Sequence, residues 1–235
     1  MLVYSLHRII GIRKLAQSSD QGRFQIISRY RHHLQVYIII SILGLLWLIT
    51  QIPVTTLVAL APLGVICILY TIPLIGGARL RDLHYIKILL IAFVWSGLAI
   101  LPIYLNLGIS LSLLFLFLEK VCYMIAITIP FDIRDLKIDG QLKTLPKMIG
   151  VTNSYRLSLF LLMVGWGFLL LAFSVDTSSL LVNETKWLAY AGFINMVTYG
   201  IIYLSRNKTS DYYYSGLIDG TLILRGLIFL ALITV

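Results

Sequence analysis

Three aspartates, Asp132, Asp135 and Asp139, lie in one short segment and account for three of the ten acidic residues in the chain. Their spacing of i, i+3 and i+7 predicts that they share one face of a helix, while Arg134 and Lys137 point elsewhere. Carboxylates packed this closely repel one another, and a hard divalent cation relieves that repulsion. Mg²⁺ usually binds one or two carboxylates together with the phosphates of a substrate. The spacing therefore predicts a magnesium site that acts on a phosphate-bearing molecule.

Two cations follow this segment, Lys143 and Lys147, and each could meet a phosphate as a point charge. A second interpretation competes with the first, because runs of charge are usually solvated faces. On spacing alone, the same segment is also compatible with a charged, solvated loop between two membrane helices.

The elements that must position these residues are apolar. The chain has 235 residues, of which 59% are hydrophobic and 12% charged, and its mean hydropathy is +0.93. Its charged fraction is about half that of a soluble domain. The apolar runs are long enough to cross a bilayer, and backbone polar groups inside a bilayer must be satisfied within each span. We therefore predict an all-α, multi-pass transmembrane bundle of seven full spans, at 34–52, 53–72, 86–105, 107–129, 154–174, 185–205 and 215–235.

The formal net charge of +9 is explained by topology rather than by nucleic-acid binding. Arg and Lys gather in every second segment between the predicted spans, and the alternate segments are nearly bare. Basic residues concentrate in the cytoplasmic loops of membrane proteins. This alternation predicts that the aspartate segment faces the cytoplasm. The sequence contains no linker, low-complexity tract or repeat, which predicts one domain over 1–235. Its predicted partners include the lipid bilayer and exclude nucleic acid.

A pair of ionisable residues, Glu119 and Lys120, lies inside a predicted span, about 20 Å along the helix from Asp132. Ionisable groups in a membrane are costly and usually face a partner or a cavity. Two interpretations remain open. The pair lines the floor of a polar pocket, or it ties the helix structurally to Arg225 or to another neighbour.

The run F-D-I-R-D-L-K-I-D-G-Q-L-K-T-L-P strongly resembles the second aspartate-rich motif of the UbiA superfamily of intramembrane prenyltransferases. The motif reads D-x-x-D-x-x-x-D followed by a Lys/Thr-Leu-Pro stretch, and it matches Asp132, Asp135, Asp139, Lys143, Thr144, Leu145 and Pro146. A weaker match, L-Y-T-I-P-L-I-G-G-A-R-L-R-D-L, is similar to a Tyr-Pro…Lys/Arg segment of that family. It points to Tyr70, Pro73, Arg79 and Arg81.

The resemblance implies a specific fold and activity. Family members have nine helices around a central cavity, so the seven spans would match family helices three to nine, with one to two N-terminal helices lacking. Two Mg²⁺ ions bind the diphosphate of a polyprenyl donor, and the prenyl group is transferred to a small acceptor, often aromatic. Carried onto this chain, Asp132, Asp135 and Asp139 become the catalytic, metal-binding residues. Arg79, Arg81, Lys143 and Tyr70 become the substrate-binding residues.

The chain departs from the family at its first aspartate-rich motif. The corresponding segment, 3–11, contains no acid, although His7 and Arg8 could touch the diphosphate directly. The start of the chain lies inside a longer gene, or the chain is a divergent branch that has lost its first site. The departure also supports an alternative function, a non-catalytic family-like protein that binds an isoprenoid or a partner.

The predicted location is a bacterial inner membrane, with the aspartate segment in the cytoplasm. A CDP-alcohol type of membrane transferase is disfavoured, because no D-G-x-x-A-R run precedes Asp132. A transporter is disfavoured by the lack of paired Gly/Pro-broken spans in corresponding halves.

Overall fold

The computed structural model describes residues 31–72, 80, 83, 86–137, 144–175, 184–208, 210 and 212–234. Every regular element in these ranges is a helix, and they contain no strand, which confirms the predicted all-helical class. The chain forms two compact units, Met1–Arg81 and Asp82–Val235, and each is described by itself. The single domain over 1–235 stays a prediction.

The first unit contributes two apolar helices, α3 (Arg31–Gln51) and α4 (Val54–Thr71). Pro53 separates them, since a proline disfavours helical geometry in the residue before it. Large apolar side chains along α3 are exposed, among them Leu43, Leu46 and Trp47. Such exposure suits a helix surrounded by lipid, where an apolar surface meets no water.

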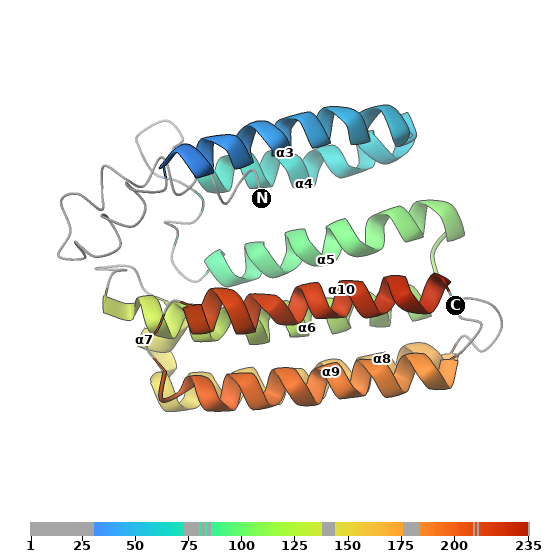
Figure 1. Cartoon of the computed structure of the whole chain (residues 1–235). Coiled ribbons are helices and arrows are strands. Elements are labelled where there is room, and N and C mark those ends of the chain that lie inside the picture. Colours follow the sequence, from blue (N-terminus) through green and yellow to red (C-terminus); the bar gives the residue numbers. More distant parts are fainter. Residues whose placement is uncertain are drawn as a thin grey trace. The chain divides into compact units, whose positions relative to one another are not determined.

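The second unit holds the remaining helices, which run lengthwise beside one another in Figure 1 apart from the short α7. They are α5 (Ile86–Leu107), α6 (Leu111–Arg134), α7 (Leu145–Ile149), α8 (Val151–Val175), α9 (Glu184–Ser205) and α10 (Asp219–Thr234). A 3-10 turn, η2 (Asp135–Lys137), follows α6, and a π-helix, η3 (Tyr213–Ile218), leads into α10.

Four of these helices are long and apolar enough to cross a membrane, so the protein is suited to a lipid bilayer. Within the described residues they are Ile86–Asn106, Leu111–Arg134, Val151–Val175 and Leu188–Ser205. Two shorter apolar helices, Gln35–Gln51 and Val54–Tyr70, lie in the first unit. The membrane-helix class is thus established in its coarse form, and the count of seven spans stays a prediction.

Short turns set the direction of the helices. The spans predicted at 86–105 and 107–129 meet at residues 108–110, since α5 continues through Leu107, and Gly108 there has a φ of 81° that favours glycine. Ser110 caps α6 by accepting a hydrogen bond from the backbone N–H of Leu113 at 3.1 Å. Gly150, with a φ of 82°, ends α7 and lets α8 begin at once.

Helices α6 and α8 form the tightest pair of the second unit. Ser112 Oγ donates to the Ala172 carbonyl at 3.0 Å, and Ser158 Oγ donates to the Ala126 carbonyl at 2.6 Å. The partner number on α8 falls as the number on α6 rises, so the two helices are antiparallel. A Cβ on Gly165 would lie 3.3 Å from Cys122 Cβ, which shows how closely the backbones approach. Small residues and serine cross-bonds are typical of packed membrane helices.

Candidate functional site: two charged clusters on one helix

The predicted aspartate segment begins where α6 ends. The α-helix stops at Arg134, and Asp135 opens the 3-10 turn η2. Asp132 therefore lies in the last turn of α6 and is only 2% exposed, while Asp135 has already left the α-helical register. We call Asp132, Asp135, Lys87 and Arg134 the terminal cluster.

Asp132 is held by a cation from the neighbouring helix. Lys87, in the first turn of α5, donates from Nζ to Asp132 Oδ1 at 2.7 Å. Both groups are largely enclosed, because the Lys87 side chain is 16% exposed and the Asp132 side chain 3%. A charge-assisted hydrogen bond of this length, in a place with little water, fixes the end of α6 against α5.

Asp135 is held by its own neighbour in sequence. Arg134 donates from Nε to Asp135 Oδ1 at 2.8 Å and from Nη2 to Oδ2 at 3.1 Å, the two-pronged geometry that suits guanidinium and carboxylate. The Arg134 guanidinium also lies over two aromatic rings, those of Phe131 and Tyr214, at 5.1 Å from each ring centre. Cation–π contacts of this kind hold the guanidinium plane in place.

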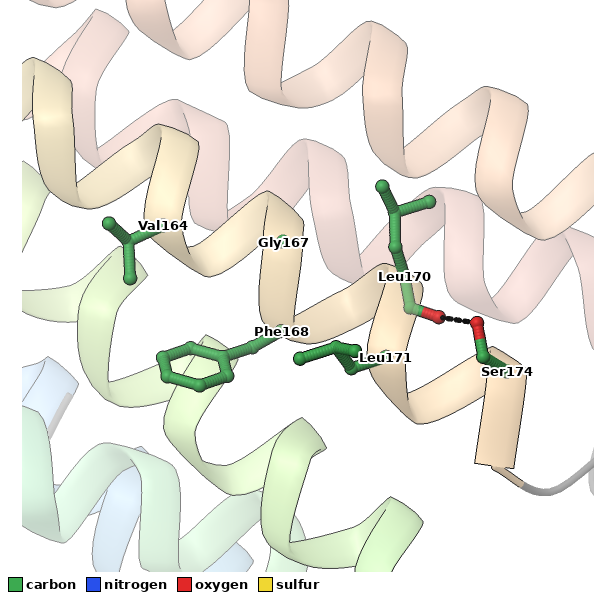
Figure 2. Close-up of a pocket in the computed structure, with 6 residues that line it drawn as sticks. All are labelled: Val164, Gly167, Phe168, Leu170, Leu171 and Ser174. Carbon is green, nitrogen blue, oxygen red and sulfur yellow. Dashed lines mark hydrogen bonds between the residues drawn. The ribbon is translucent and has the colours of Figure 1, made fainter.

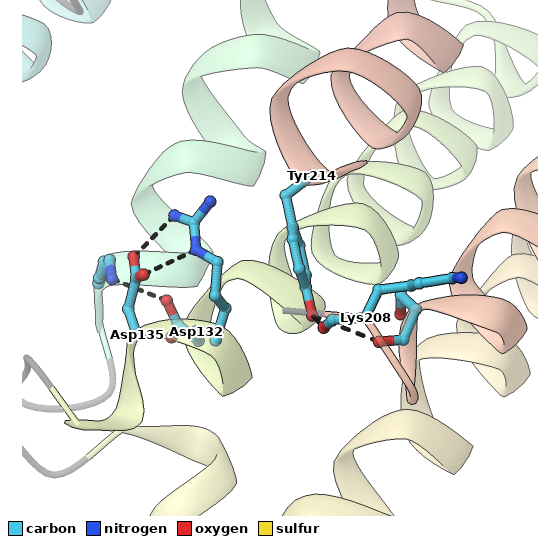
Figure 3. A network of polar contacts seen from close by, with 7 residues as sticks. Asp132, Asp135, Lys208 and Tyr214 are labelled. Carbon is cyan, nitrogen blue, oxygen red and sulfur yellow. Dashed lines mark hydrogen bonds and ion pairs between the residues drawn. The ribbon is translucent and has the colours of Figure 1, made fainter. Parts of the chain in front are cut away.

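Tyr214 connects the terminal cluster to the end of α9. Its hydroxyl donates to the Lys208 carbonyl at 3.0 Å (Figure 3). It also donates to the Ser205 carbonyl at 3.4 Å. The ring is 2% exposed and contacts that of Phe131 edge-on. Burial raises the pKa of the Tyr214 hydroxyl above its ordinary value. The side chain therefore acts as a neutral donor and as a wall for Arg134.

The predicted orientation of Arg134 was wrong. On an α-helix that continued through Asp139, Arg134 would point away from the aspartates. The α-helix ends at Arg134, and the tighter 3-10 turn brings the carboxylate of Asp135 back onto the guanidinium. The terminal cluster is thus a mixed-sign arrangement of two acids and two bases.

The other predicted site residues are only partly described. Asp139, Lys143, Arg79 and Arg81 lie outside the described residues. Tyr70 lies near the end of α4, in the first unit. Within the described residues no group of three His, Cys, Asp or Glu side chains is placed to hold a metal ion.

The Thr-Leu-Pro stretch folds as the start of α7, which packs against α6 and α8. Thr144 occupies the N-cap position of this short helix without a side-chain capping hydrogen bond, and it is 6% exposed. Its Oγ1 has no hydrogen-bond partner among the residues that the structure describes. A buried hydroxyl without a partner is costly, so this atom is a candidate contact for a ligand.

A second group of charges lies in the middle of α6. Glu119, 1% exposed, accepts a hydrogen bond from Arg225 Nη2 on α10 and another from Lys120 Nζ at 3.0 Å. The structural tie between Glu119 and Arg225, one of the two open interpretations, is confirmed. We call Glu119, Lys120 and Arg225 the mid-helix cluster.

Aromatic and hydroxyl groups extend the mid-helix cluster towards α9. The Arg225 guanidinium lies over the Tyr123 ring at 4.3 Å from its centre. The Tyr123 hydroxyl shares a hydrogen bond with Thr198 Oγ1 at 3.1 Å, and Thr198 is fully buried. The cluster ties α6 to α10, and the Tyr123–Thr198 contact beside it ties α6 to α9.

A surface groove of about 430 Å³ lies on α8, away from both clusters. Figure 2 shows its lining residues, which all come from one helix: Val164, Gly167, Phe168, Leu170, Leu171 and Ser174. The Ser174 hydroxyl already donates to the Leu170 carbonyl at 2.8 Å. The groove offers only apolar contact, as a helix facing lipid does, and supplies no chemistry.

Sequence reasoning missed Lys87 and Tyr214 as members of the site. Both come from helices other than α6, so no local spacing pointed to them. One signal was present for Lys87, a cation at the start of an apolar run, where it must find a partner or reach the membrane surface. The sequence run Tyr212, Tyr213 and Tyr214 predicts an interfacial belt, because tyrosines gather where a membrane meets water. Tyr212 is 84% exposed, as a belt requires, but Tyr214 is turned into the protein.

The terminal cluster combines carboxylate oxygens, which are ligands for a hard cation, with ammonium and guanidinium donors, which bind phosphate oxygens. Its position at the end of an apolar helix suits a molecule with a charged head and an apolar tail. Comparisons of the chain with protein-family models, with curated proteins and with solved structures found no match.

Proposed function

We propose that this protein is an integral-membrane transferase that moves a polyprenyl group from its diphosphate to a small acceptor, for example an aromatic molecule. The observation that carries this proposal is the terminal cluster, two buried or half-buried acids and two bases at one end of a helix suited to span a membrane. The resemblance of the aspartate segment to the UbiA superfamily motif supports the same assignment.

We also propose that Mg²⁺ serves at this site, with Asp132, Asp135 and Asp139 as its ligands. The residues present fit the ion in one respect, since the described donors are carboxylate oxygens one turn apart. The terminal cluster itself has no net charge, because its two acids balance its two bases. A neutral cluster attracts a diphosphate weakly, so added positive charge is required. Bound Mg²⁺ supplies that charge and stabilises the departing diphosphate.

The chain's own bases then orient the diphosphate. Lys87 and Arg134 donate hydrogen bonds to the carboxylates of Asp132 and Asp135. If Mg²⁺ bound these carboxylates, the two bases would be released to donate to phosphate oxygens. Lys143 is proposed to contribute to the same site, while the assignment of Arg79, Arg81 and Tyr70 to donor binding stays a prediction from the resemblance. The buried Thr144 hydroxyl, which lacks a partner within the described residues, is proposed as a further contact of the head group.

The membrane arrangement belongs to the same proposal. Seven spans would orient the aspartate segment towards the cytoplasm of a bacterial inner membrane, in line with the alternation of basic segments. The prenyl tail would lie among apolar side chains, where the absence of water protects a carbocation formed when the diphosphate leaves.

The test measures transfer of label from tritiated geranylgeranyl diphosphate into hexane-extractable product, in membranes that contain the full chain, with Mg²⁺ or with EDTA. We expect Mg²⁺-dependent product that falls by about 100-fold in Asp135→Asn and in Asp139→Asn, because each loses a charged group at the reacting head. Asp219→Asn is the matched control, since Asp219 lies in the first turn of α10, outside the cluster. Equal product from Asp135→Asn and the wild type would overturn the assignment.

One observation favours a second candidate, a non-catalytic protein that binds an isoprenoid or a partner. Asp132 and Asp135 are already paired with Lys87 and Arg134, so the folded chain balances them without an added cation. This candidate predicts that geranylgeranyl diphosphate binds equally with Mg²⁺ and with EDTA and is recovered intact.

A further inference from the structure

The mid-helix cluster contains more hydrogen-bond donors than acceptors. Lys120 has three N–H donors and Arg225 has five, whereas the only carboxylate is that of Glu119. Each cation donates one hydrogen bond to the Glu119 carboxylate. Arg225 Nη1 is buried and has no hydrogen-bond partner among the described residues. The cluster therefore lacks acceptor oxygens.

The same cluster carries one uncompensated positive charge. Glu119 and Lys120 occupy the ninth and tenth positions of the 24-residue helix α6, and Arg225 reaches them from α10. Two cations therefore face one carboxylate. The place is about 20 Å along the helix from Asp132, well inside the apolar region. An excess of positive charge at this depth is costly, and intramembrane cations are normally neutralised by anionic partners. The described part of the chain supplies no second anion to this cluster.

Lys120 is the accessible member of the cluster. Its side chain is 31% exposed, whereas that of Glu119 is 1% exposed and that of Arg225 15%. The exposed part belongs to a helix suited to span a membrane, so what reaches it must come from among lipid chains or from the space between helices. The Tyr123 ring, which lies against Arg225, adds an apolar face beside the charge.

We propose that the mid-helix cluster binds the carboxylate of an amphiphilic molecule that enters from the bilayer. A carboxylate supplies the two acceptor oxygens and the one negative charge that the cluster lacks. It matches the single surplus charge, whereas a phosphate carries more charge and is harder to remove from water. This site is separate from the terminal cluster and does not depend on prenyl transfer.

The test uses the full chain in detergent micelles and measures binding of radiolabelled laurate, with dodecanol and dodecyl phosphate as matched probes. Laurate is expected to bind at least tenfold more tightly than either. Lys120→Met is expected to weaken laurate binding at least tenfold, because it removes the surplus charge and leaves the Glu119–Arg225 pair intact. Lys120→Arg is expected to retain binding. Lys208→Met is the control, since Lys208 is exposed in the turn after α9.

A second measurement needs no variant. A laurate analogue with a photoreactive diazirine beside its carboxylate should cross-link to residues around 119–124 of α6 and to α10. Binding of dodecanol equal to that of laurate, tighter binding of dodecyl phosphate, unchanged binding in Lys120→Met, or cross-links confined to the Asp132 end of α6 would each overturn the proposal. Loss of prenyl transfer without loss of laurate binding would count only against the proposed activity.

Discussion

The terminal and mid-helix clusters lie on the same helix and differ in charge balance. The terminal cluster pairs two acids with two bases near the end of α6, where side chains can still reach the membrane surface. The mid-helix cluster sets two bases against one acid in the interior of the same helix. The difference teaches that burial alone does not decide how charges are arranged. The more deeply placed cluster is the less balanced one, which is the reverse of what stability alone favours.

The largest effect should come from removing the one acid of the mid-helix cluster. Glu119→Gln leaves Lys120 and Arg225 facing each other without a counter-charge, and we expect a loss of about 3–5 kcal/mol in the free energy of unfolding. Unfolding of the purified protein in mild detergent, titrated with SDS and followed by circular dichroism, measures it. The triple variant with Lys120→Met and Arg225→Met should recover much of the loss. An unfolding curve identical to that of the wild type would contradict the role assigned to Glu119.

A smaller effect is expected at the terminal cluster. Lys87→Met leaves the enclosed Asp132 carboxylate without its cation, and we expect a loss of about 2–3 kcal/mol, less than in the membrane interior. The same titration measures it, and Asp132→Asn completes a double-variant cycle. The combined variant should lose less than the sum of the single losses, because the two side chains act through one contact. Strictly additive losses would show that the 2.7 Å contact is not energetically important.

A pair of packing variants compares two positions on α8, one packed against α6 and one open. Gly165→Val adds atoms where α8 approaches Glu119 O and Cys122 Cβ, at 3.4 and 3.3 Å from a Cβ, so we expect a loss of about 1–3 kcal/mol. Gly167→Val is the matched control, since a Cβ there meets nothing within 4 Å. Thermal unfolding of both variants in detergent provides the comparison. Equal unfolding midpoints would mean that α8 can shift to accommodate the added side chain at Gly165, and that close packing of α8 against α6 is not required there.

The smallest effect concerns Tyr214. Tyr214→Phe removes the hydrogen bond to the Lys208 carbonyl but keeps the ring over Arg134, so we expect a loss of about 1 kcal/mol at neutral pH. SDS titration of this variant, beside Tyr212→Phe on the exposed neighbour, measures it.

The pH dependence gives Tyr214 a second test. Burial raises the pKa of its hydroxyl in the folded state, so the folded protein keeps a proton that the unfolded chain loses above about pH 10. The corresponding stability is fully present below that pH and is lost as the pH rises towards the folded value. The wild type should therefore lose stability more steeply than Tyr214→Phe between about pH 9 and 11. Parallel slopes would argue against a buried, neutral hydroxyl.

The sequence was informative about elements and less so about contacts between them. Long apolar runs predicted helices and a membrane environment, because a span must satisfy its own backbone. The tie from Glu119 to Arg225 could be anticipated, since few charges lie inside the spans and they need partners. The pairing of Arg134 with Asp135 could not, because it depends on the exact residue at which α6 becomes a 3-10 turn. Lys87 and Tyr214 reach the cluster only through the packing of α5 and η3, which local spacing does not record.

The π-helix η3 connects contacts at both clusters, because it carries Tyr214, which contacts Arg134, and leads into α10, which carries Arg225. An α-helix turns about 100° per residue, so one residue added or removed between these two would swing Arg225 to another side of α10. Tyr214 would stay against Arg134 while Glu119 lost its partner. The wide π-helical turn thus sets the rotation of α10, so that Tyr214 contacts Arg134 while Arg225 contacts Glu119. Chains that share this architecture are expected to tolerate substitutions at 215–217, all exposed here, far better than any change in length.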